Sequence, residues 1–337
     1  MAEERLTVAV TGPTGTFGFA LIPLLETDDR IARTVGIARR PFEPADRGWN
    51  KMEYRRGDVR DPEVLEEAFS GADVVVHLAF MITGTGPRET IREINVEGTL
   101  NAFRCAAAAG AKRFVYASSV AAYGFHPDNP VGMTEDWPAR PAAHLFYAQE
   151  KAELEGALKD EASAHPALDL YLLRPPIVLG PHVIGAKDLL PGRLAPLGRR
   201  LVNLARGRSP IPLPAPAPSL PVQFIHEDDV AQALLLCVVC AGPPGAYNIA
   251  GDGVLTGADV ARELGLTPLP VPGRPIQAVA RALAALPTPG PLPPATEWME
   301  ALTHPAIMDA SKARLELGWR PRYSGLEALR DTLGRNA

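Results

Sequence analysis

The segment most informative about the fold is Thr11-Gly12-Pro13-Thr14-Gly15-Thr16-Phe17-Gly18. It follows an apolar run that predicts a strand over residues 6–11, and it opens a pattern that predicts a helix over residues 16–27. Helix N-termini present free N–H groups and a partial positive charge, and glycines let the backbone approach a pyrophosphate closely. The spacing G-x-x-G-x-x-G therefore predicts a dinucleotide-binding loop. The residues expected to bind the cofactor there are Gly12, Thr14, Gly15, Thr16, Phe17 and Gly18.

Short apolar runs alternate with helical patterns through the first half of the chain. Runs such as Val74–Val76 and Phe114–Tyr116 are typical of parallel strands buried on both faces. The alternation predicts an α/β fold, a Rossmann-type doubly wound parallel sheet with a smaller C-terminal substrate-binding lobe. After the strand at 6–11, strands are predicted at 33–38, 52–56, 73–78, 113–118 and 169–174, with helices at 62–69, 88–109 and 144–164.

The length of 337 residues favours one large domain with a smaller lobe, because a single hydrophobic core rarely grows to that size. We expect a dinucleotide-binding Rossmann domain at residues 1–180, with residues 222–250 packing back on it. Residues 181–221 and 251–337 are then expected to form the substrate-binding lobe.

Charge and cysteine content exclude several classes of protein. The net charge is −5 and the basic residues are scattered, which gives no surface for nucleic acid or an anionic membrane. No run approaches the roughly 18 apolar residues of a membrane span, and the N-terminus lacks the features of a signal peptide. Cys237 and Cys240 are interpreted as packing residues, and His226–Asp229 as a helix start, so no metal site is predicted. We expect a cytoplasmic protein.

The end of the second predicted strand bears on the choice of cofactor. A site selective for NAD usually carries an acid there, but this chain has Arg39 and Arg40. Planar guanidinium groups bind a 2′-phosphate well. The sequence therefore favours NADP, while NAD with solvent-exposed arginines stays an alternative.

A tyrosine and a lysine four residues apart mark the catalytic centre. Tyr147 and Lys151 share one face of a predicted helix. A nearby ammonium and a positive nicotinamide ring lower a phenol's pKa from about 10 toward a usable value. The strand before this helix ends in Ser118 and Ser119, at the edge where open α/β sheets bind ligands. A serine hydroxyl there is expected to hold the substrate oxygen.

With these motifs the chain resembles the extended short-chain dehydrogenase/reductase family, the NAD-dependent epimerase/dehydratase group. The matching motifs run almost end to end: Thr11–Gly18, Gly57–Val59, His77–Ala79, Asn95–Thr99, Ser118–Ser119 with Tyr123–Gly124, Tyr147 with Lys151, Arg174–Pro175 and Leu317–Pro321.

The resemblance implies roles for several residues. Of the two serines, Ser119 matches the catalytic one by its spacing from Tyr123, which completes the trio of Ser119, Tyr147 and Lys151. Lys151 is implied to bond the nicotinamide ribose. The other implied cofactor contacts are Asp58 and Val59 at the adenine, Leu78 and Ala79 along the channel, and Pro175 to Ile177 near the nicotinamide. A turn or capping role beside Asp61 stays open for Asp58.

Departures from the sugar-nucleotide epimerases bear on the substrate. Those enzymes place an asparagine and an arginine for the diphosphate where this chain has Ile177 and Val222. A buried diphosphate without charge-assisted donors binds poorly. The proline-rich stretches Ser209–Pro221 and Pro268–Pro294 are interpreted as apolar loops that wall a pocket.

The sequence therefore predicts a ketone reductase or alcohol dehydrogenase for a hydrophobic carbonyl substrate, with Tyr147 as the acid/base. A sugar-nucleotide epimerase or dehydratase remains an alternative. So does a dinucleotide-sensing protein without turnover, although the intact trio counts against it. The resemblance also implies a homodimer formed through long helices near residues 90–108 and 147–163.

Overall fold

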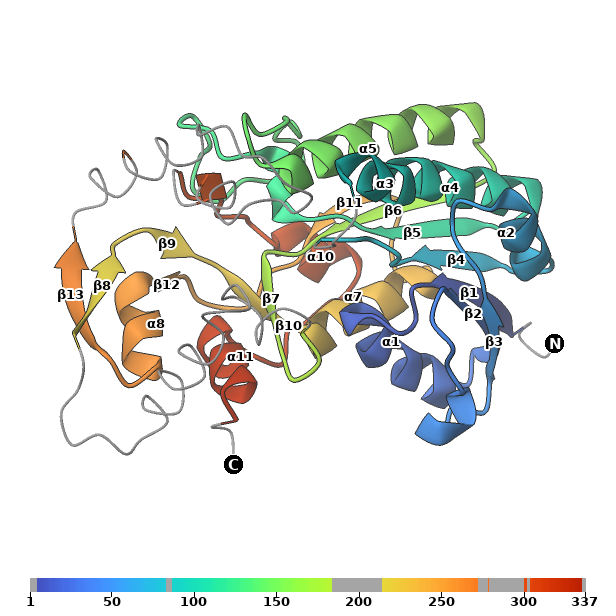
Figure 1. The fold of residues 1–337 in the computed structure, drawn as a ribbon, viewed down its shortest axis with the longest axis horizontal. Helices are drawn as coiled ribbons and strands as arrows, with labels where there is room; N and C mark the ends of the chain where they lie inside the picture. The colour runs from blue at the N-terminus through green and yellow to red at the C-terminus, as the bar shows by residue number, and fades with distance from the viewer. Residues whose placement is uncertain are drawn as a thin grey trace.

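The computed structural model describes residues 5–82, 87–183, 214–271, 278, 300–301 and 304–334. At its centre lies a seven-stranded sheet, all parallel, in the order β11-β6-β5-β4-β1-β2-β3 (Figure 1). The order reverses between β1 and β4, which is where doubly wound sheets bind their ligands. The predicted Rossmann-type sheet is confirmed. Its strands are β1 (Leu6–Thr11), β2 (Ile31–Ala38), β3 (Met52–Arg56), β4 (Val74–His77), β5 (Arg113–Ala117), β6 (Asp169–Arg174) and β11 (Gly245–Asn248).

Helices cover both faces of this sheet (Figure 1). Two of them, α1 and α7, pack together on one face, while α2, α4 and α5 lie on the other. Short turns of 3₁₀ helix, η1 and η3, follow β2 and β5. The bounds are α1 (Thr16–Thr27), η1 (Pro44–Arg47), α2 (Pro62–Phe69), α3 (Arg88–Arg92), α4 (Gly98–Ala108), η3 (Val120–Tyr123), α5 (Phe146–Ala164) and α7 (Glu227–Val238).

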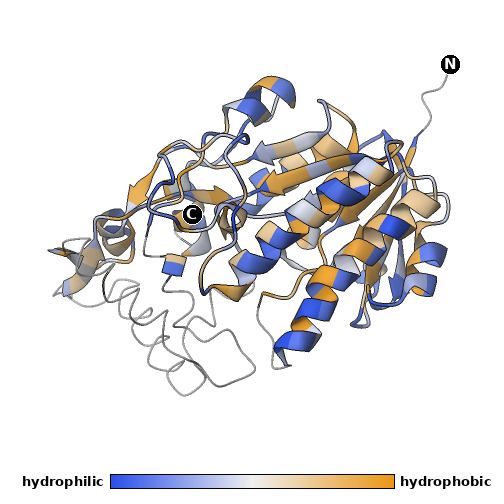
Figure 2. Ribbon diagram, turned by 90° about the horizontal axis from the view of Figure 1, so that it is seen from above, coloured by the Kyte–Doolittle hydropathy of each residue, from blue (hydrophilic) through white to orange (hydrophobic). Residues whose placement is uncertain are grey.

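The strands supply side chains alternately to two hydrophobic cores. Val8 and Val10 of β1 lie in the core with α1 and α7, while Ala9 between them lies in the core with α2, α4 and α5. Strand β4 repeats the pattern. This alternation explains why the strands read as continuous apolar runs, because both faces are buried. In Figure 2 the central strands are accordingly mostly hydrophobic and the outer helices are banded.

The helix predicted over residues 88–109 is not one regular α-helix. A π-helical turn, η2 (Glu93–Glu97), separates α3 from α4, with Asn95 at its centre. Such turns insert an extra residue and are frequent at functional sites. Hydrophobic periodicity did not reveal this turn, because a phase shift of one residue is hard to detect between helical segments as short as α3 and α4.

Within its described residues, the C-terminal part adds three two-stranded sheets and the helices α8, α10 and α11. Strand β11, by contrast, joins the main sheet beside β6, and α7 packs on α1. Helix α11 contacts β7 and β10 beside the sheet. The bounds are β7 (Ile177–Leu179), β8 (Pro214–Pro218), β9 (Pro221–Val222), β10 (Phe224–His226), β12 (Leu255–Thr256), α8 (Gly257–Glu263), β13 (Thr267–Val271), α10 (Ser311–Glu316) and α11 (Gly325–Thr332).

The proline-rich stretches were expected to be loops, and the parts of them that the structure describes include strands. Residues 214–218 and 267–271 are paired parallel strands and not loops; residues 209–213, 272–277 and 279–294 lie outside the described residues. The register sets each proline of the pair opposite a residue of another type, for example Pro268 opposite Ala215. In a parallel ladder only every second residue of a strand bonds to a given partner, so prolines at alternate positions are tolerated.

The prediction that both cysteines of the C-x-x-C pair are packing residues is confirmed for one of them and wrong for the other. Cys237 is buried in α7, but Cys240 is exposed just after that helix, where its backbone φ is 56°. His226 caps α7 as expected: its side chain accepts a hydrogen bond from the N–H of Asp228.

Within the described ranges, no helix is both long enough and apolar enough to cross a bilayer. The helices expected to dimerise, α4 and α5, also lack exposed large apolar side chains in the described part of the chain. Ion pairs of Arg92 with Glu153 and of Arg104 with Glu161 link α3 and α4 to α5 instead. The homodimer stays a prediction.

Candidate active site

The glycine-rich loop leaves the N-terminus of α1 open. Gly12 has a φ of +72°, and a Cβ there would lie 2.8 Å from the N of Ala79. A Cβ at Gly18 would lie 2.3 Å from the carbonyl O of Pro13, so this glycine is required for packing. Gly15 precedes α1 without a side-chain cap, and a Cβ there would meet only the carbonyl O of Gly12, at 3.4 Å. The uncapped N–H groups and close backbone fit a pyrophosphate.

The other predicted loop residues contribute less through their side chains. Phe17 is partly buried, and its ring packs against the core. Thr16 donates a hydrogen bond from its hydroxyl to the carbonyl of His182, 3.2 Å away, which ties the loop to the chain after β7. Thr14 is half-buried in the loop.

A neutral histidine holds the ends of β1 and β4 in place. The Thr99 hydroxyl donates to the carbonyl of Asn95, so it must accept from Nε2 of His77, 3.0 Å away. Nδ1 of His77 then accepts from the Thr11 hydroxyl at 2.9 Å, and that oxygen accepts from the N–H of Ala79 at 3.3 Å. Burial lowers the pKa of His77 to about 3, so the ring is uncharged at neutral pH. Leu78 and Ala79, predicted to line the cofactor channel, follow directly.

Arginines gather at the ends of β2 and β3. The Arg39 guanidinium reaches across to the sulfur of Met81, 3.5 Å away, on the chain after β4. Arg40 is exposed, and neither Arg39 nor Arg40 has an ion-pair partner within the described part of the chain. Arg56, which sequence reasoning missed, donates from Nε to the carbonyl of Arg39 at 3.0 Å. These guanidinium groups make this edge positively charged.

Asp58 and Val59 lie at the same edge, after β3. Asp58 accepts hydrogen bonds from Nε and Nη2 of Arg60, at 3.1 and 2.9 Å. The residue that caps α2 is Asp61 and not Asp58. Val59 is buried, and a Cβ at Gly98 would lie 2.4 Å from its Cγ2, so α4 packs closely on it.

The structure brings the predicted trio together at the carboxyl edge of β5. Ser119 hydrogen-bonds the phenol of Tyr147, although burial, the larger effect, raises the pKa of that phenol to about 12. The Ser119 hydroxyl also accepts from the N–H of Ala121 at 3.1 Å. Pro175, at the end of β6, fixes the same turn by accepting from the N–H of Val120 at 2.9 Å. The expected lowering of this pKa by a nearby ammonium is not found, and Tyr147 carries its proton at neutral pH.

Lys151 lies one helical turn after Tyr147 and is only 2% exposed. Its Nζ donates to the Tyr116 hydroxyl and to the carbonyl of Ala117, both at 2.8 Å. The ammonium lies over the face of Phe80, 3.7 Å from the ring centroid. Burial lowers the pKa of Lys151 to about 7. Sequence reasoning missed Tyr116 and Phe80, which were visible only as apolar strand and loop residues.

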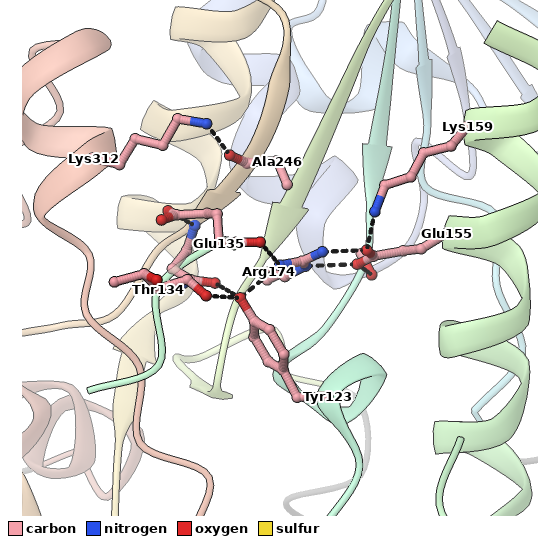
Figure 3. A network of polar contacts seen from close by, with 10 residues as sticks. Tyr123, Thr134, Glu135, Glu155, Lys159, Arg174, Ala246 and Lys312 are labelled. Atoms are coloured by element: carbon pink, nitrogen blue, oxygen red, sulfur yellow. Dashed lines mark hydrogen bonds and ion pairs between the residues drawn. The ribbon is translucent and has the colours of Figure 1, made fainter. Parts of the chain in front are cut away.

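Ser118 belongs to a different network, centred on the buried pair of Arg174 and Glu155; Figure 3 shows that pair with Tyr123. Its hydroxyl donates to Oε1 of Glu155, 2.7 Å away, and Nε of Arg174 donates to the same oxygen at 2.8 Å. Arg174 also donates to the Tyr123 hydroxyl, which donates to Asn248 on β11 at 2.8 Å. The network ties β5, β6, α5 and β11 together beneath the trio. Glu155 was missed, but its position four residues after Lys151 was a usable signal.

A carboxylate from far along the chain holds the turn that leads into α5. Helix α5 has no side-chain cap at Leu145, and Glu300 accepts instead from three successive backbone N–H groups. The distances are 2.8 Å from Ala143, 2.7 Å from His144 and 2.6 Å from Leu145. Negative charge at a helix N-terminus is stabilising. No local pattern could have identified Glu300, since it lies 155 residues from Leu145.

Two positions bear on the class of substrate, and both carry aliphatic side chains. Ile177 begins β7 and is 51% exposed. Val222 is half-buried in β9, paired with Leu255.

A dinucleotide loop at the switch point of a parallel sheet, with a serine–tyrosine–lysine trio beside it, defines the short-chain dehydrogenase/reductase class. Residues 8–250 match the model of the NAD dependent epimerase/dehydratase family, and the chain belongs to that family. The resemblance stated from the sequence is confirmed.

Several curated proteins match this chain. An uncharacterised protein of Mycobacterium tuberculosis is 28% identical over 334 residues, which cover 96% of this chain and 82% of that protein. The ceramide reductase of Caulobacter vibrioides is 28% identical over 327 residues, covering 95% and 87%. The N-acetyl-alpha-D-glucosaminyl-diphospho-ditrans,octacis-undecaprenol 4-epimerase of Escherichia coli is 33% identical, but over 37% of each chain.

Solved structures share the fold. The UDP-glucose 4-epimerase of Thermus thermophilus superposes with a TM-score of 0.68 at 22% identity, covering 98% of both chains. The dTDP-glucose 4,6-dehydratase of Bacillus anthracis gives 0.71 at 17% identity, covering 98% and 96%. Both were solved in complex with NAD. Identity this low establishes the shared fold alone.

Proposed function

We propose that the protein is an NADP(H)-dependent ketone reductase or alcohol dehydrogenase that acts on a hydrophobic small molecule. The observation that carries the proposal is Ile177, an aliphatic side chain left 51% exposed at the position where the family's sugar-nucleotide enzymes have a diphosphate anchor. An exposed isoleucine offers no donor to an anion but gains from apolar contact, at roughly 25 cal/mol per Å² buried.

The trio suits a proton transfer at a carbonyl oxygen. A bound nicotinamide supplies the hydride in reduction and accepts it in oxidation. Tyr147 keeps its proton at neutral pH because burial raises its pKa to about 12, so the proton that reduction needs is in place. Ser119, bonded to the same phenol, is placed to orient the substrate oxygen. Lys151 places positive charge one helical turn away.

Other apolar groups support a hydrophobic substrate. Ile82 is exposed on the chain that follows β4, at the carboxyl edge of the sheet, as Ile177 is after β6. Among the relatives that span nearly the whole chain, the Caulobacter vibrioides protein is named for a lipid substrate, ceramide. Pockets lined by such side chains select ligands by shape and apolar area, with a few polar groups to orient them.

NADP(H) is favoured by the edge that carries Arg39, Arg40 and Arg56. No acid stands at the end of β2 to hold a ribose 2′-hydroxyl, and the guanidinium groups of Arg39 and Arg40 are free of ion pairs in the described residues. A 2′-phosphate would give these groups a hydrogen-bonded anionic partner, whereas the Asp58 carboxylate acts on Arg39 only through space. The two related structures were solved with NAD, so titration with both NADPH and NADH tests the proposed preference.

A sugar-nucleotide epimerase is the second candidate, and the Escherichia coli relative favours it over part of the chain. Calorimetric titration of the NADPH-loaded protein with UDP separates the two, with the Thermus thermophilus epimerase titrated in parallel as a positive control. We expect no UDP binding in the micromolar range. Micromolar binding that competes with turnover would return the protein to the sugar-nucleotide enzymes.

A further inference from the structure

We propose that the Tyr116 hydroxyl is a positioning group for Lys151, which fixes the direction of the ammonium and satisfies its nitrogen whether or not it is charged. The inference rests on the proposed function, because it assigns Lys151 a role in nucleotide binding. It adds a residue from β5 to the site, outside the serine–tyrosine–lysine trio.

The hydrogen bonds of Lys151 define its direction. An ammonium has three N–H donors. Two of them meet consecutive residues of β5, the Tyr116 hydroxyl and the Ala117 carbonyl, each at 2.8 Å. The third has no hydrogen-bond acceptor among the described residues, so it is available to a ligand. A single rigid strand thus determines where the third donor points.

Aromatic rings enclose the same nitrogen. Nζ lies 3.7 Å from the ring centroid of Phe80, 4.5 Å from that of Tyr116 and 5.8 Å from that of Tyr147. Phe80 and Tyr147 are themselves in edge-to-face contact at 5.6 Å. Ring faces stabilise a desolvated cation. Rings, however, impose little direction, so the hydroxyl and the carbonyl must provide it.

The Tyr116 hydroxyl can both accept and donate a hydrogen bond, whereas the Ala117 carbonyl can only accept one. Because burial lowers the pKa of Lys151 to about 7, ammonium and neutral amine are both populated near neutrality. A phenol accepts from the ammonium and can donate to the amine, whereas a carbonyl only accepts. The other titratable groups that face Lys151 are the carboxylates of Glu150 and Glu155 on α5, the Tyr147 phenol, and His77 on β4, which is neutral.

The test measures the dissociation constant of NADPH against pH by quenching of tryptophan fluorescence, in the wild type and in Tyr116→Phe. Tyr171→Phe is the matched control, since it removes a buried hydroxyl from neighbouring β6, where Tyr171 bonds the Gly242 carbonyl. In the wild type, affinity should fall as pH rises through about 7 and Lys151 loses its proton. In Tyr116→Phe this midpoint should move to lower pH, because the charge-assisted bond lost from the ammonium is stronger than the bond lost from the neutral amine. Binding at neutral pH should weaken by about two- to tenfold.

The possible results distinguish the role of Tyr116 from the proposed function. A midpoint that stays in place in Tyr116→Phe, with pH-dependent binding in the wild type, overturns the role of Tyr116 alone. A wild type that binds neither NADPH nor NADH overturns the proposed function and this inference together. If Tyr116→Phe does not fold, NMR titration of lysine-labelled wild type decides, with Lys151→Met for assignment. A Lys151 that titrates near the ordinary value of about 10.4 contradicts the buried contact.

Discussion

The Ser119 hydroxyl and the Tyr147 phenol are hydrogen-bonded across the carboxyl edge of the sheet, one at the end of β5 and the other at the start of α5. The serine is fixed by the N–H of Ala121, and the tyrosine by the helix that carries it. A carbonyl oxygen placed between two such donors would be oriented by the serine and protonated by the tyrosine.

Replacing Tyr147 by phenylalanine should lower turnover by at least about 100-fold, because it removes the transferable proton and little else. Affinity for NADPH, measured by fluorescence, should stay within about twofold. Ser119→Ala should cost less, about 1 kcal/mol or fivefold, since it removes one orienting hydrogen bond. Tyr171→Phe serves as the control for loss of a buried hydroxyl. A fully active Tyr147→Phe protein would refute the assignment of the acid.

The guanidinium groups at the end of β2 should determine the cofactor. Arg39→Asp combined with Arg40→Ala should weaken NADPH binding by about tenfold or more, because a charge-assisted contact to the 2′-phosphate is lost. NADH binding should change much less. Titration of both nucleotides with both proteins provides the measurement. Tighter binding of NADH than of NADPH by the native protein would show that these arginines only face solvent.

Glu300 should stabilise the start of the catalytic helix. Glu300→Ala removes a buried acceptor from three backbone N–H groups, so we expect the free energy of unfolding to fall by about 2 kcal/mol. Glu153→Ala, which breaks an exposed ion pair on the same helix, should cost less than about 1 kcal/mol. Urea unfolding of the two variants tests this. Equal losses would mean that the Glu300 contacts contribute no more than a surface pair.

His77 should make stability depend on pH in the acid range. Its folded pKa of about 3 lies below the unfolded value of 6.5, so only the unfolded chain binds this proton between those values. Stability must therefore fall as the pH drops through that window. Relative to His77→Gln, the wild type should lose about 2 kcal/mol between pH 7 and pH 5 in urea unfolding. A difference between the two proteins that is the same at both pH values would show that His77 is not buried uncharged.

Much of the fold could be predicted because local patterns determined it. The bounds of β1, β3, β6, α1 and α2 agree with the prediction, since each is a clear apolar run or amphipathic segment with a cap or turn beside it. The π turn at Glu93–Glu97 and the strands made of alternating prolines were missed. Both depend on backbone hydrogen bonding that residue periodicity does not encode.

The site was predictable where its residues are close in sequence or match a motif. Ser119, Tyr147 and Lys151 are brought together as expected. Tyr116, Phe80 and Glu300 were not found, because their contributions depend on where the fold places them: a hydroxyl at the end of a buried strand, a ring over an ammonium, a carboxylate beneath a distant helix. Tertiary contacts of this kind leave no spacing to recognise.

The proposed activity is tested most directly by following oxidation of NADPH with a panel of bulky hydrophobic ketones and, at equal protein load, a series of UDP- and dTDP-sugars assayed for interconversion. A hydrophobic ketone should be reduced with one NADPH consumed per alcohol formed. Tyr147→Phe should abolish this reaction, and the sugar nucleotides should be unchanged. Interconversion of a sugar nucleotide without net consumption of NADPH, together with inert ketones, would contradict the proposed activity.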